Sequence, residues 1–325
     1  MSHLPKWNEE RMKLEHIGFY TLEDSRALNC SKSSPLWRCE LLVTGLCNFK
    51  CPYCRGSRTN EDIPVEKALF IIDKWAADGL KNIRFSGGEP MMYKHIEKLV
   101  EHSKEKGINR IAISTNGSFQ IERYIRLINL GVNDFSISLD SCCSSFGDKM
   151  AGVTGAWDNV VYNIQELSKL TYVTVGCVFT DETLNELENT ISFASSLGVA
   201  DIRVISSAQN NITPKLNSSK EILDRHPILK YRVNNFNSDR SVRGITKKDS
   251  KTCFLALDDM AVEGDYHYPC IIHLRETKKP IGRIDGDIRQ DRGNWVKSHN
   301  CFEDEVCRKN CLDVCVDYNN ACCLN

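Results

Sequence analysis

The chain of 325 residues carries 42 basic and 43 acidic side chains, so its formal net charge at pH 7 is −1. This balance gives no electrostatic footprint for nucleic acid or for a membrane surface. The start of the chain lacks the basic-then-apolar pattern of a secretory signal, and no stretch approaches the length of a transmembrane helix. We therefore expect a cytoplasmic protein, in which 16 cysteines favour metal binding over disulfide formation.

Strands and helices are predicted to alternate, which is typical of a parallel sheet with helical crossovers. The predicted strands are 39–44, 82–86, 110–114, 134–139, 172–179 and 201–206. The predicted helices between them are 64–78, 91–106, 119–130, 157–170 and 183–197. Gly79, Gly107, Gly131 and Gly198 each follow a helix directly, as C-cap glycines do. The pattern predicts an α/β fold.

Three cysteines directly follow the first predicted strand. Cys47, Cys51 and Cys54 form a C-x3-C-x2-C set in the run LCNFKCPYCR, residues 46–55. An iron–sulfur cluster that only carries electrons has a thiolate on each iron, so three thiolates leave one iron open for a substrate or cofactor. A zinc site is the alternative, but zinc sites usually close with four ligands and no fourth Cys or His follows nearby. The set therefore favours chemistry at an iron atom.

Polar and turn residues follow the next three predicted strands, in the runs NIRFSGGEP (82–90), RIAISTNG (110–117) and DFSISLD (134–140). The carboxyl ends of parallel strands form the active site in such sheets, so these residues are expected at one edge. Taken alone, each run is also compatible with an ordinary turn or a solvated strand end. The candidate residues are Gly87, Gly88, Glu89, Pro90, Thr115, Asn116, Ser138 and Asp140.

The cysteine spacing, the aromatic Tyr53 before the last cysteine and the order of these motifs resemble the signature of the radical S-adenosylmethionine (SAM) enzymes. The resemblance implies an open (βα)6 partial TIM barrel over about residues 37–208. It also implies SAM chelated to the open iron of a [4Fe-4S] cluster and an electron donor such as flavodoxin or ferredoxin. In that family, an electron cleaves SAM and the resulting 5′-deoxyadenosyl radical abstracts a hydrogen atom from the substrate. The family's turn motif corresponds to Gly87–Pro90, which would hold the SAM amino group, while Thr115, Asn116, Ser138 and Asp140 would bind its ribose and carboxylate.

The C-terminal quarter of the chain is rich in cysteine. Cys253, Gly264 and Cys270 resemble the opening of the SPASM and Twitch auxiliary-cluster extensions of this family. A full SPASM tail begins with a C-x2-C pair whose first cysteine is missing here, so we expect one auxiliary [4Fe-4S] cluster, with two clusters or a structural zinc knuckle as alternatives. The expected ligands are Cys253 and Cys270, with two among Cys301, Cys307, Cys311 and Cys315.

The predicted domains are an N-terminal extension (1–36), the partial barrel (37–208), a polar connector (209–250) and the auxiliary-cluster domain (251–325). In the resembling families the substrate is most often a peptide or protein. The alternatives are a dehydrogenase or isomerase of a small molecule, such as a sugar or nucleoside, and a non-enzymatic iron–sulfur or zinc protein. Sulfatase-maturating relatives carry an Asp where this chain has Ile271, so formylglycine formation is not predicted.

One further thiol is a candidate for catalysis. Cys142, beside Cys143, lies in the loop after the fourth predicted strand, at the expected active-site end. Because the S–H bond is weak, Cys142 is a candidate donor of a hydrogen atom to a substrate radical. A variable loop that only happens to contain cysteines is the alternative.

Overall fold

The computed structural model describes residues 25–31, 33–56 and 60–323. The chain divides into two compact units. Among the described residues, unit 1 comprises 47–54 and 112–242, and unit 2 comprises 25–46, 55–111 and 243–323. Most of the predicted N-terminal extension lies outside the described residues, and the predicted domain boundaries stay predictions.

Unit 2 contains strands in the order β2-β1-β7-β8-β9. Strand β1 pairs in parallel with both β2 and β7, so a C-terminal strand extends the sheet of an N-terminal one. Arg38 of β1 forms an ion pair with Asp259 of β7 at 2.5 Å, which joins these two segments. The strands are β1 (Arg38–Thr44), β2 (Asn82–Gly87), β7 (Asp259–Glu263), β8 (Tyr266–Tyr268) and β9 (Gly282–Arg283).

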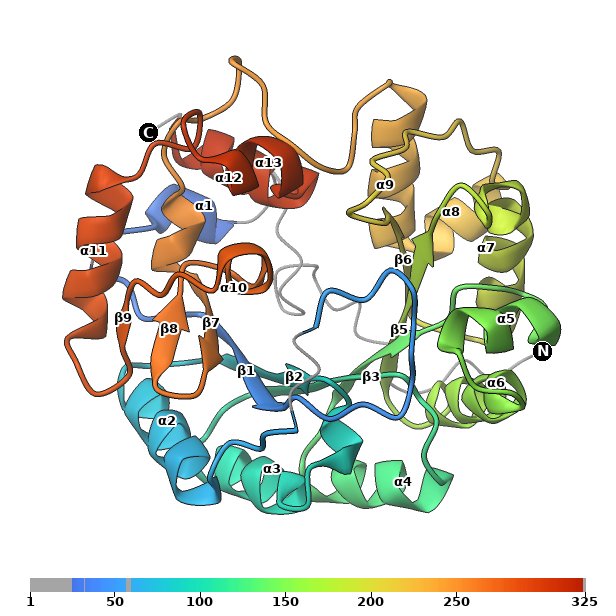
Figure 1. The fold of residues 1–325 in the computed structure, drawn as a ribbon, viewed down its shortest axis with the longest axis horizontal. Coiled ribbons are helices and arrows are strands. Elements are labelled where there is room, and N and C mark those ends of the chain that lie inside the picture. The colour runs from blue at the N-terminus through green and yellow to red at the C-terminus, as the bar shows by residue number, and fades with distance from the viewer. Residues whose placement is uncertain (1–24, 32, 57–59, 324–325) are drawn as a thin grey trace. The chain divides into compact units, whose positions relative to one another are not determined.

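Helices of unit 2 fall into a group before residue 111 and a group in the C-terminal segment (Figure 1). The first group is α1 (Ser25–Asn29), α2 (Val65–Ala77), η3 (Pro90–Met92) and α3 (Ile96–Glu105). The second group is η5 (Phe254–Leu257), α10 (Ile271–Thr277), α11 (Ile288–Ser298), α12 (Glu305–Asn310) and α13 (Asp313–Cys322).

Unit 1 contains parallel strands in the order β6-β5-β4-β3. The strands are β3 (Arg110–Thr115, whose last four residues belong to this unit), β4 (Asp134–Ser138), β5 (Tyr172–Phe179) and β6 (Asp201–Ser206). The helices are α4 (Ile121–Leu130), α5 (Ser144–Ala151), α6 (Ala156–Leu167), η4 (Leu184–Glu186), α7 (Leu187–Ser196), α8 (Lys220–Arg225) and α9 (Pro227–Asn237). Strand residues such as Phe135, Ile137 and Val175 are fully buried, as expected where both faces of a parallel sheet are covered.

All six predicted strands are confirmed, and no predicted strand end differs from the observed one by more than one residue. The predicted helix 91–106 is instead divided between η3 and α3, because Tyr93 has an extended backbone with φ −71° and ψ 116°. Helix α5 was not predicted. It contains Gly147, although glycine is a poor helix former. An added Cβ at this position would lie 2.1 Å from the Trp157 ring, so close packing against Trp157 requires a glycine here.

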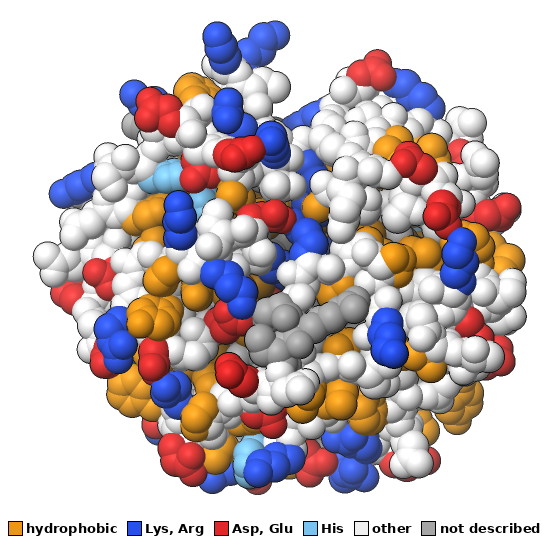
Figure 2. Space-filling model, in the orientation of Figure 1, with side chains coloured by type: hydrophobic (Ala, Val, Ile, Leu, Met, Phe, Trp, Pro, Cys, Tyr) orange, Lys and Arg blue, Asp and Glu red, His pale blue; other side chains and the backbone are white. Residues whose placement is uncertain are grey.

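Charges of both signs are interspersed over most of the face shown in Figure 2, which agrees with the near-neutral composition. Among the described residues, no helix is long and apolar enough to cross a membrane.

Candidate active site

The cysteine loop lies in unit 1, directly after β1. The Cys54 N–H donates to the Cys51 carbonyl at 3.2 Å, and the Phe49 N–H donates to the Cys47 Sγ at 3.4 Å. Burial first, and then the negative charges of Asp140, Cys54 and Cys47, raise the pKa of the Cys51 thiol to about 12. The thiols of Cys47 and Cys54 are therefore close enough to Cys51 to change its pKa. Three ligands of one metal cluster must be grouped in this way, whereas three unrelated thiols need not be.

The paired-glycine turn lies in unit 2, at the end of β2. The Gly88 N–H donates to the Thr44 carbonyl at 2.7 Å, and the Glu89 N–H donates to the Leu46 carbonyl at 2.6 Å. A Cβ on Gly87 would lie 2.2 Å from the Thr44 oxygen, and one on Gly88 would lie 2.0 Å from the Leu46 oxygen. The glycines therefore permit close approach to the backbone that immediately precedes Cys47, and so they position the start of the cysteine loop.

Glu89 and Pro90 begin the short helix η3. The Glu89 side chain is buried and accepts a hydrogen bond from the Met91 N–H at 3.0 Å, while Pro90 occupies the first helical position. This contact fixes the direction of the Glu89 carboxylate, and binding of the SAM amino group by Glu89 stays a prediction.

Asn116 is bonded to the cysteine loop. Its amide Nδ2 donates to the Asn48 Oδ1 at 2.8 Å, and its Oδ1 accepts from the Ser118 N–H at 3.0 Å. Thr115 is buried, and its Oγ1 lies 3.2 Å from the Tyr124 hydroxyl and accepts from the Gly117 N–H at 3.1 Å. Asn116 therefore holds the residue next to Cys47, and Asn48 is a positioning residue that the sequence analysis missed.

Asp140 follows the end of β4 and contacts the second half of the cysteine loop. Its carboxylate accepts hydrogen bonds from the Tyr53 hydroxyl and, at 2.8 Å, from the Val178 N–H. Burial raises the pKa of Asp140 to about 6. Ser138, at the end of β4, is exposed. Roles of Ser138 and Asp140 in SAM binding stay predictions.

Cys142 and Cys143 lie at the start of α5, with their Sγ atoms 3.4 Å apart. Burial raises the pKa of the Cys142 thiol, and the Thr190 side chain of α7 opposes this shift by hydrogen bonding. Cys142 therefore contacts a helix of unit 1, and its role as a hydrogen-atom donor stays a prediction.

The C-terminal cysteines converge within unit 2. Burial raises the pKa of Cys270 to about 12, and the pKa values of Cys311 and Cys315 lie well above the usual range, first because of burial and then because of neighbouring thiolates. Each member of one set of four acts on the pKa of another, and every one of their pairs is within electrostatic range. These residues are Cys253, Cys270, Cys311 and Cys315, and Cys307 has the same relationship to Cys253, Cys270 and Cys311.

Cys301 and Cys307 lie beside this set. Cys301 is hydrogen bonded to both Cys253 and Cys307. The remaining cysteines of the tail point elsewhere, because the Cys322 Sγ donates to the Ala27 carbonyl at 3.0 Å and the Cys323 Sγ contacts the Ser250 Oγ at 3.1 Å. The grouped thiols fit an iron–sulfur cluster, which takes cysteine thiolates as its ligands.

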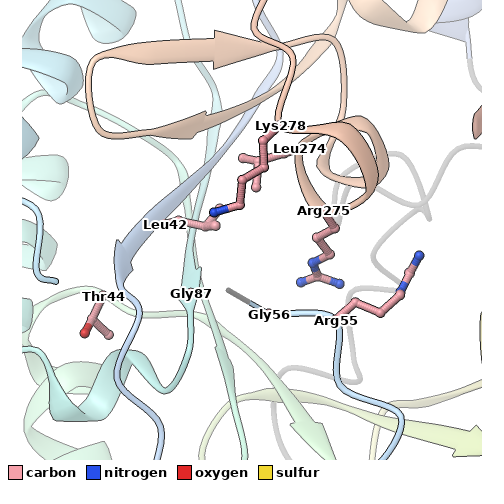
Figure 3. Close-up of a pocket in the computed structure, with 8 residues that line it drawn as sticks. All are labelled: Leu42, Thr44, Arg55, Gly56, Gly87, Leu274, Arg275 and Lys278. Carbon is pink, nitrogen blue, oxygen red and sulfur yellow. The ribbon is translucent and has the colours of Figure 1, made fainter. Parts of the chain in front are cut away.

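A pocket in unit 2 opens beside Gly87. Figure 3 shows Arg275 and Lys278 reaching from the end of α10 toward the strand that carries Leu42 and Thr44. The pocket is lined by Leu42, Thr44, Arg55, Gly56, Gly87, Leu274, Arg275 and Lys278.

Each cation of the pocket has an acidic neighbour. Arg55 pairs with Glu276, the Arg275 guanidinium lies 3.9 Å from the Glu40 carboxylate, and the Lys278 Nζ lies 3.7 Å from the Glu263 carboxylate. Although burial acts in the opposite direction, Arg275 and two further arginines lower the pKa of Glu40. The carboxylates therefore balance the charge of the basic side chains, and no local motif in the sequence indicates this pocket.

Residues 41–194 match the family described as "Radical SAM superfamily". This segment therefore belongs to the radical SAM superfamily, as its motifs predicted, and the match implies SAM and a [4Fe-4S] cluster as cofactors.

Curated relatives match about half of this chain or less. Molybdenum cofactor biosynthesis protein 1 of Dictyostelium discoideum is 34% identical over 157 residues, covering 45% of this chain and 24% of that protein. Probable GTP 3′,8-cyclase of Sulfurisphaera tokodaii is 26% identical over 168 residues, covering 50% of this chain and 53% of that protein. AdoMet-dependent heme synthase of Methanosarcina barkeri is 26% identical over 168 residues, covering 50% and 48%.

Solved structures match a larger part of the chain. Streptococcus suis SuiB bound to S-adenosylmethionine has a TM-score of 0.59 and 14% identity over 88% of this chain and 74% of that chain. Native anSMEcpe with bound AdoMet has a TM-score of 0.58 and 14% identity over 88% of this chain and 94% of that chain. At these identities the similarity shows the fold, and it confirms the predicted class, an α/β partial barrel of parallel strands with a cysteine-rich C-terminal region.

Proposed function

We propose that this protein reductively cleaves SAM at a [4Fe-4S] cluster bound by Cys47, Cys51 and Cys54 and abstracts a hydrogen atom from a peptide or protein substrate. The observation that carries the proposal is the grouping of these three thiols in one loop. The backbone directly before this loop accepts hydrogen bonds from the N–H groups of Gly88 and Glu89. The bound cluster supplies the electron that splits SAM into methionine and the radical that takes the substrate hydrogen.

The neighbouring side chains of unit 1 hold the cysteine loop in place. Asn116 bonds to Asn48, next to the first cysteine, and Asp140 bonds to Tyr53, between the second and third. In unit 2, the buried Glu89 carboxylate suits the ammonium group of SAM, because a carboxylate forms a charge-assisted hydrogen bond with it. These roles are proposed from the side chains' contacts and their places in the motifs.

We further propose that Cys253, Cys270, Cys311 and Cys315 bind one auxiliary [4Fe-4S] cluster. Every pair within this set lies within electrostatic range, as four ligands of one cluster require. Four thiolates would complete the cluster, which suits electron transfer better than binding of a substrate to an open iron.

A peptide substrate is supported by the extent of the structural similarity. The match to SuiB bound to its precursor peptide SuiA covers 87% of this chain with a TM-score of 0.59, and the match to anSMEcpe with a Cp18Cys peptide covers 88%. A small anionic substrate is the second candidate. It is favoured by sequence similarity to a probable GTP 3′,8-cyclase.

The experiment that separates these candidates uses anaerobically reconstituted protein with dithionite and SAM. Formation of 5′-deoxyadenosine tests SAM cleavage, and the Cys47/Cys51/Cys54→Ala variant is the control. Mass spectrometry of a co-expressed candidate peptide should show a change in mass that depends on these cysteines. An unchanged peptide, together with deuterium transfer from a labelled nucleotide into 5′-deoxyadenosine, would favour the small-molecule candidate.

A further inference from the structure

Unit 2 contains a group of metal-ligating side chains that the proposed clusters do not use. His273 lies on α10, His299 directly follows α11, and Asp304 and Cys307 lie at the start of α12. One ligand atom from each residue lies within 4.8 Å of those of the other three. His273 and Cys307 are buried, and His299 and Asp304 are half-buried. Three segments of the chain therefore bring two imidazoles, a carboxylate and a thiol to one point.

The separations of these atoms match those of a tetrahedral metal shell. The Cys307 Sγ lies 3.4 Å from the His299 Nε2 and 3.6 Å from the His273 Nε2, and the His273 Nε2 lies 3.5 Å from the Asp304 Oδ1. With the usual zinc–ligand distances and tetrahedral angles, sulfur and nitrogen ligands lie about 3.6 Å apart, and nitrogen and oxygen ligands about 3.4 Å apart. We propose that His273, His299, Asp304 and Cys307 form a mononuclear zinc site.

The donor set distinguishes this site from the adjacent cluster. Iron–sulfur clusters take mainly thiolates, whereas a set of two imidazoles, one carboxylate and one thiolate suits the borderline-soft Zn²⁺ ion. Cys307 also lies within electrostatic range of Cys253, Cys270 and Cys311. We assign it to the zinc site because its Sγ lies 3.4 Å from the His299 Nε2 and 3.6 Å from the His273 Nε2. The zinc proposal rests on the proposed function at one point, which is that Cys307 is not a ligand of the auxiliary cluster.

The imidazole rings are held in position by an aromatic neighbour. The Trp295 ring stacks on the His299 ring, with centroids 4.0 Å apart and an interplanar angle of 16°. The Trp295 ring also meets the His273 ring edge-on, with centroids 6.0 Å apart. Such packing reduces the rearrangement that metal binding requires.

Four protein ligands close the coordination shell, so the site is structural and leaves no position for a substrate. It would join α10 to the start of α12. Since Arg275 of the pocket beside Gly87 lies on α10, the metal would also restrain one wall of that pocket.

The test compares a His273→Gln/His299→Gln variant with His267→Gln as a matched control. His267 is also a buried histidine of unit 2, and its Nε2 lies 3.2 Å from the Asp291 carboxylate, but it is not part of the group of four. Each protein is purified anaerobically from zinc-supplemented cells, and zinc, iron and sulfide are measured per chain. The double variant should lose about one zinc per chain and keep its iron and sulfide, while the control keeps all three.

Unchanged zinc in the double variant, or a parallel loss of iron and zinc, would overturn the proposal. X-ray absorption at the zinc edge gives a second measurement, in which wild-type zinc should show one sulfur neighbour that disappears in Cys307→Ser. A shell of four sulfur atoms would place the zinc in the cluster cysteines and would also overturn it. Formation of 5′-deoxyadenosine is followed in parallel, and its failure in the wild type would contradict the proposed function without affecting the zinc result.

Discussion

The Tyr53 hydroxyl donates a hydrogen bond to the Asp140 carboxylate, so the loop between Cys51 and Cys54 is joined to the end of β4. Asp140 is held in turn by the Val178 N–H, 2.8 Å away. The aromatic residue of the cysteine motif therefore links the cysteine loop to the sheet of unit 1.

Replacement of Tyr53 by Phe should disturb the first cluster site. A hydrogen bond to a charged group contributes about 1.5–3 kcal/mol, and its loss leaves the buried carboxylate with one donor fewer. We expect a severalfold slower formation of 5′-deoxyadenosine with unchanged C-terminal iron. Tyr162→Phe is the control, since Tyr162 is 51% exposed, and an equal loss of activity in both variants would contradict the role of Tyr53.

The Cys47/Cys51/Cys54→Ala variant should lose reductive cleavage of SAM completely, because no thiolates remain to bind the first cluster. The C-terminal cysteines are unaffected, so close to one four-iron cluster per chain should remain, as measured by iron and sulfide analysis. Continued formation of 5′-deoxyadenosine by this variant is incompatible with the proposed site.

Replacement of Gly88 by Ala should affect both SAM binding and the first cluster. The added Cβ would lie 2.0 Å from the Leu46 carbonyl oxygen and would displace the backbone before Cys47. Calorimetry should show loss of SAM binding, and iron analysis should show a loss confined to the first cluster. Gly107→Ala adds a Cβ with nothing within 4 Å, at a positive φ of 76°, and should keep both properties.

Replacement of Cys253 or Cys270 by Ser should lower the C-terminal iron and, because thiolate–metal bonds contribute to folding, destabilise the C-terminal segment. The measurement is iron content in the triple-alanine background, together with the thermal unfolding temperature. Cys323→Ser is the matched control because Cys323 is exposed and its thiol contacts the Ser250 hydroxyl. If this control loses as much iron, the assigned ligand set is wrong.

His226 should make unit 1 sensitive to acid. Its Nδ1 donates to the Ala200 carbonyl at 3.2 Å, its Nε2 lies 2.9 Å from the Ser195 Oγ, and burial lowers its pKa to about 4. In the unfolded chain, His226 has its ordinary pKa of 6.5. The stability that neutral His226 contributes to the folded state is therefore full above pH 6.5 and is lost as the pH falls toward 4.

The loss amounts to about 3 kcal/mol over this interval. Asp201, whose pKa burial raises to about 7, accepts a hydrogen bond from the Ile228 N–H of α9 and has the opposite effect on stability over this interval. The contribution of His226 is therefore measured as the difference between wild type and His226→Asn in how much the hydrogen-exchange protection of α9 falls between pH 6.5 and 4. In His226→Asn, which retains a donor near Ala200 but does not titrate, the decrease should be much smaller. A wild-type decrease that persists in this variant would show that another group is responsible.

The sequence alone was sufficient to predict the strands and the radical SAM superfamily, and it indicated Cys47, Cys51 and Cys54 as the expected ligands of the first cluster. Buried parallel strands appear as apolar runs that end in glycine and polar turns, and Cys47, Cys51 and Cys54 are close enough in the chain for their spacing to identify them. Local pattern is sufficient where the interacting residues are neighbours in sequence.

Only the tertiary structure decided how distant residues combine. Spacing could not show which of Cys301, Cys307, Cys311 and Cys315 lie near Cys253 and Cys270, because that depends on how the segments that carry them pack together. It could not show that a Cβ on Gly88 would meet the Leu46 carbonyl, or that Arg55 and Arg275 line one pocket. These relationships arise from contacts between segments as many as 220 residues apart in the chain, for which no local periodicity provides a signal.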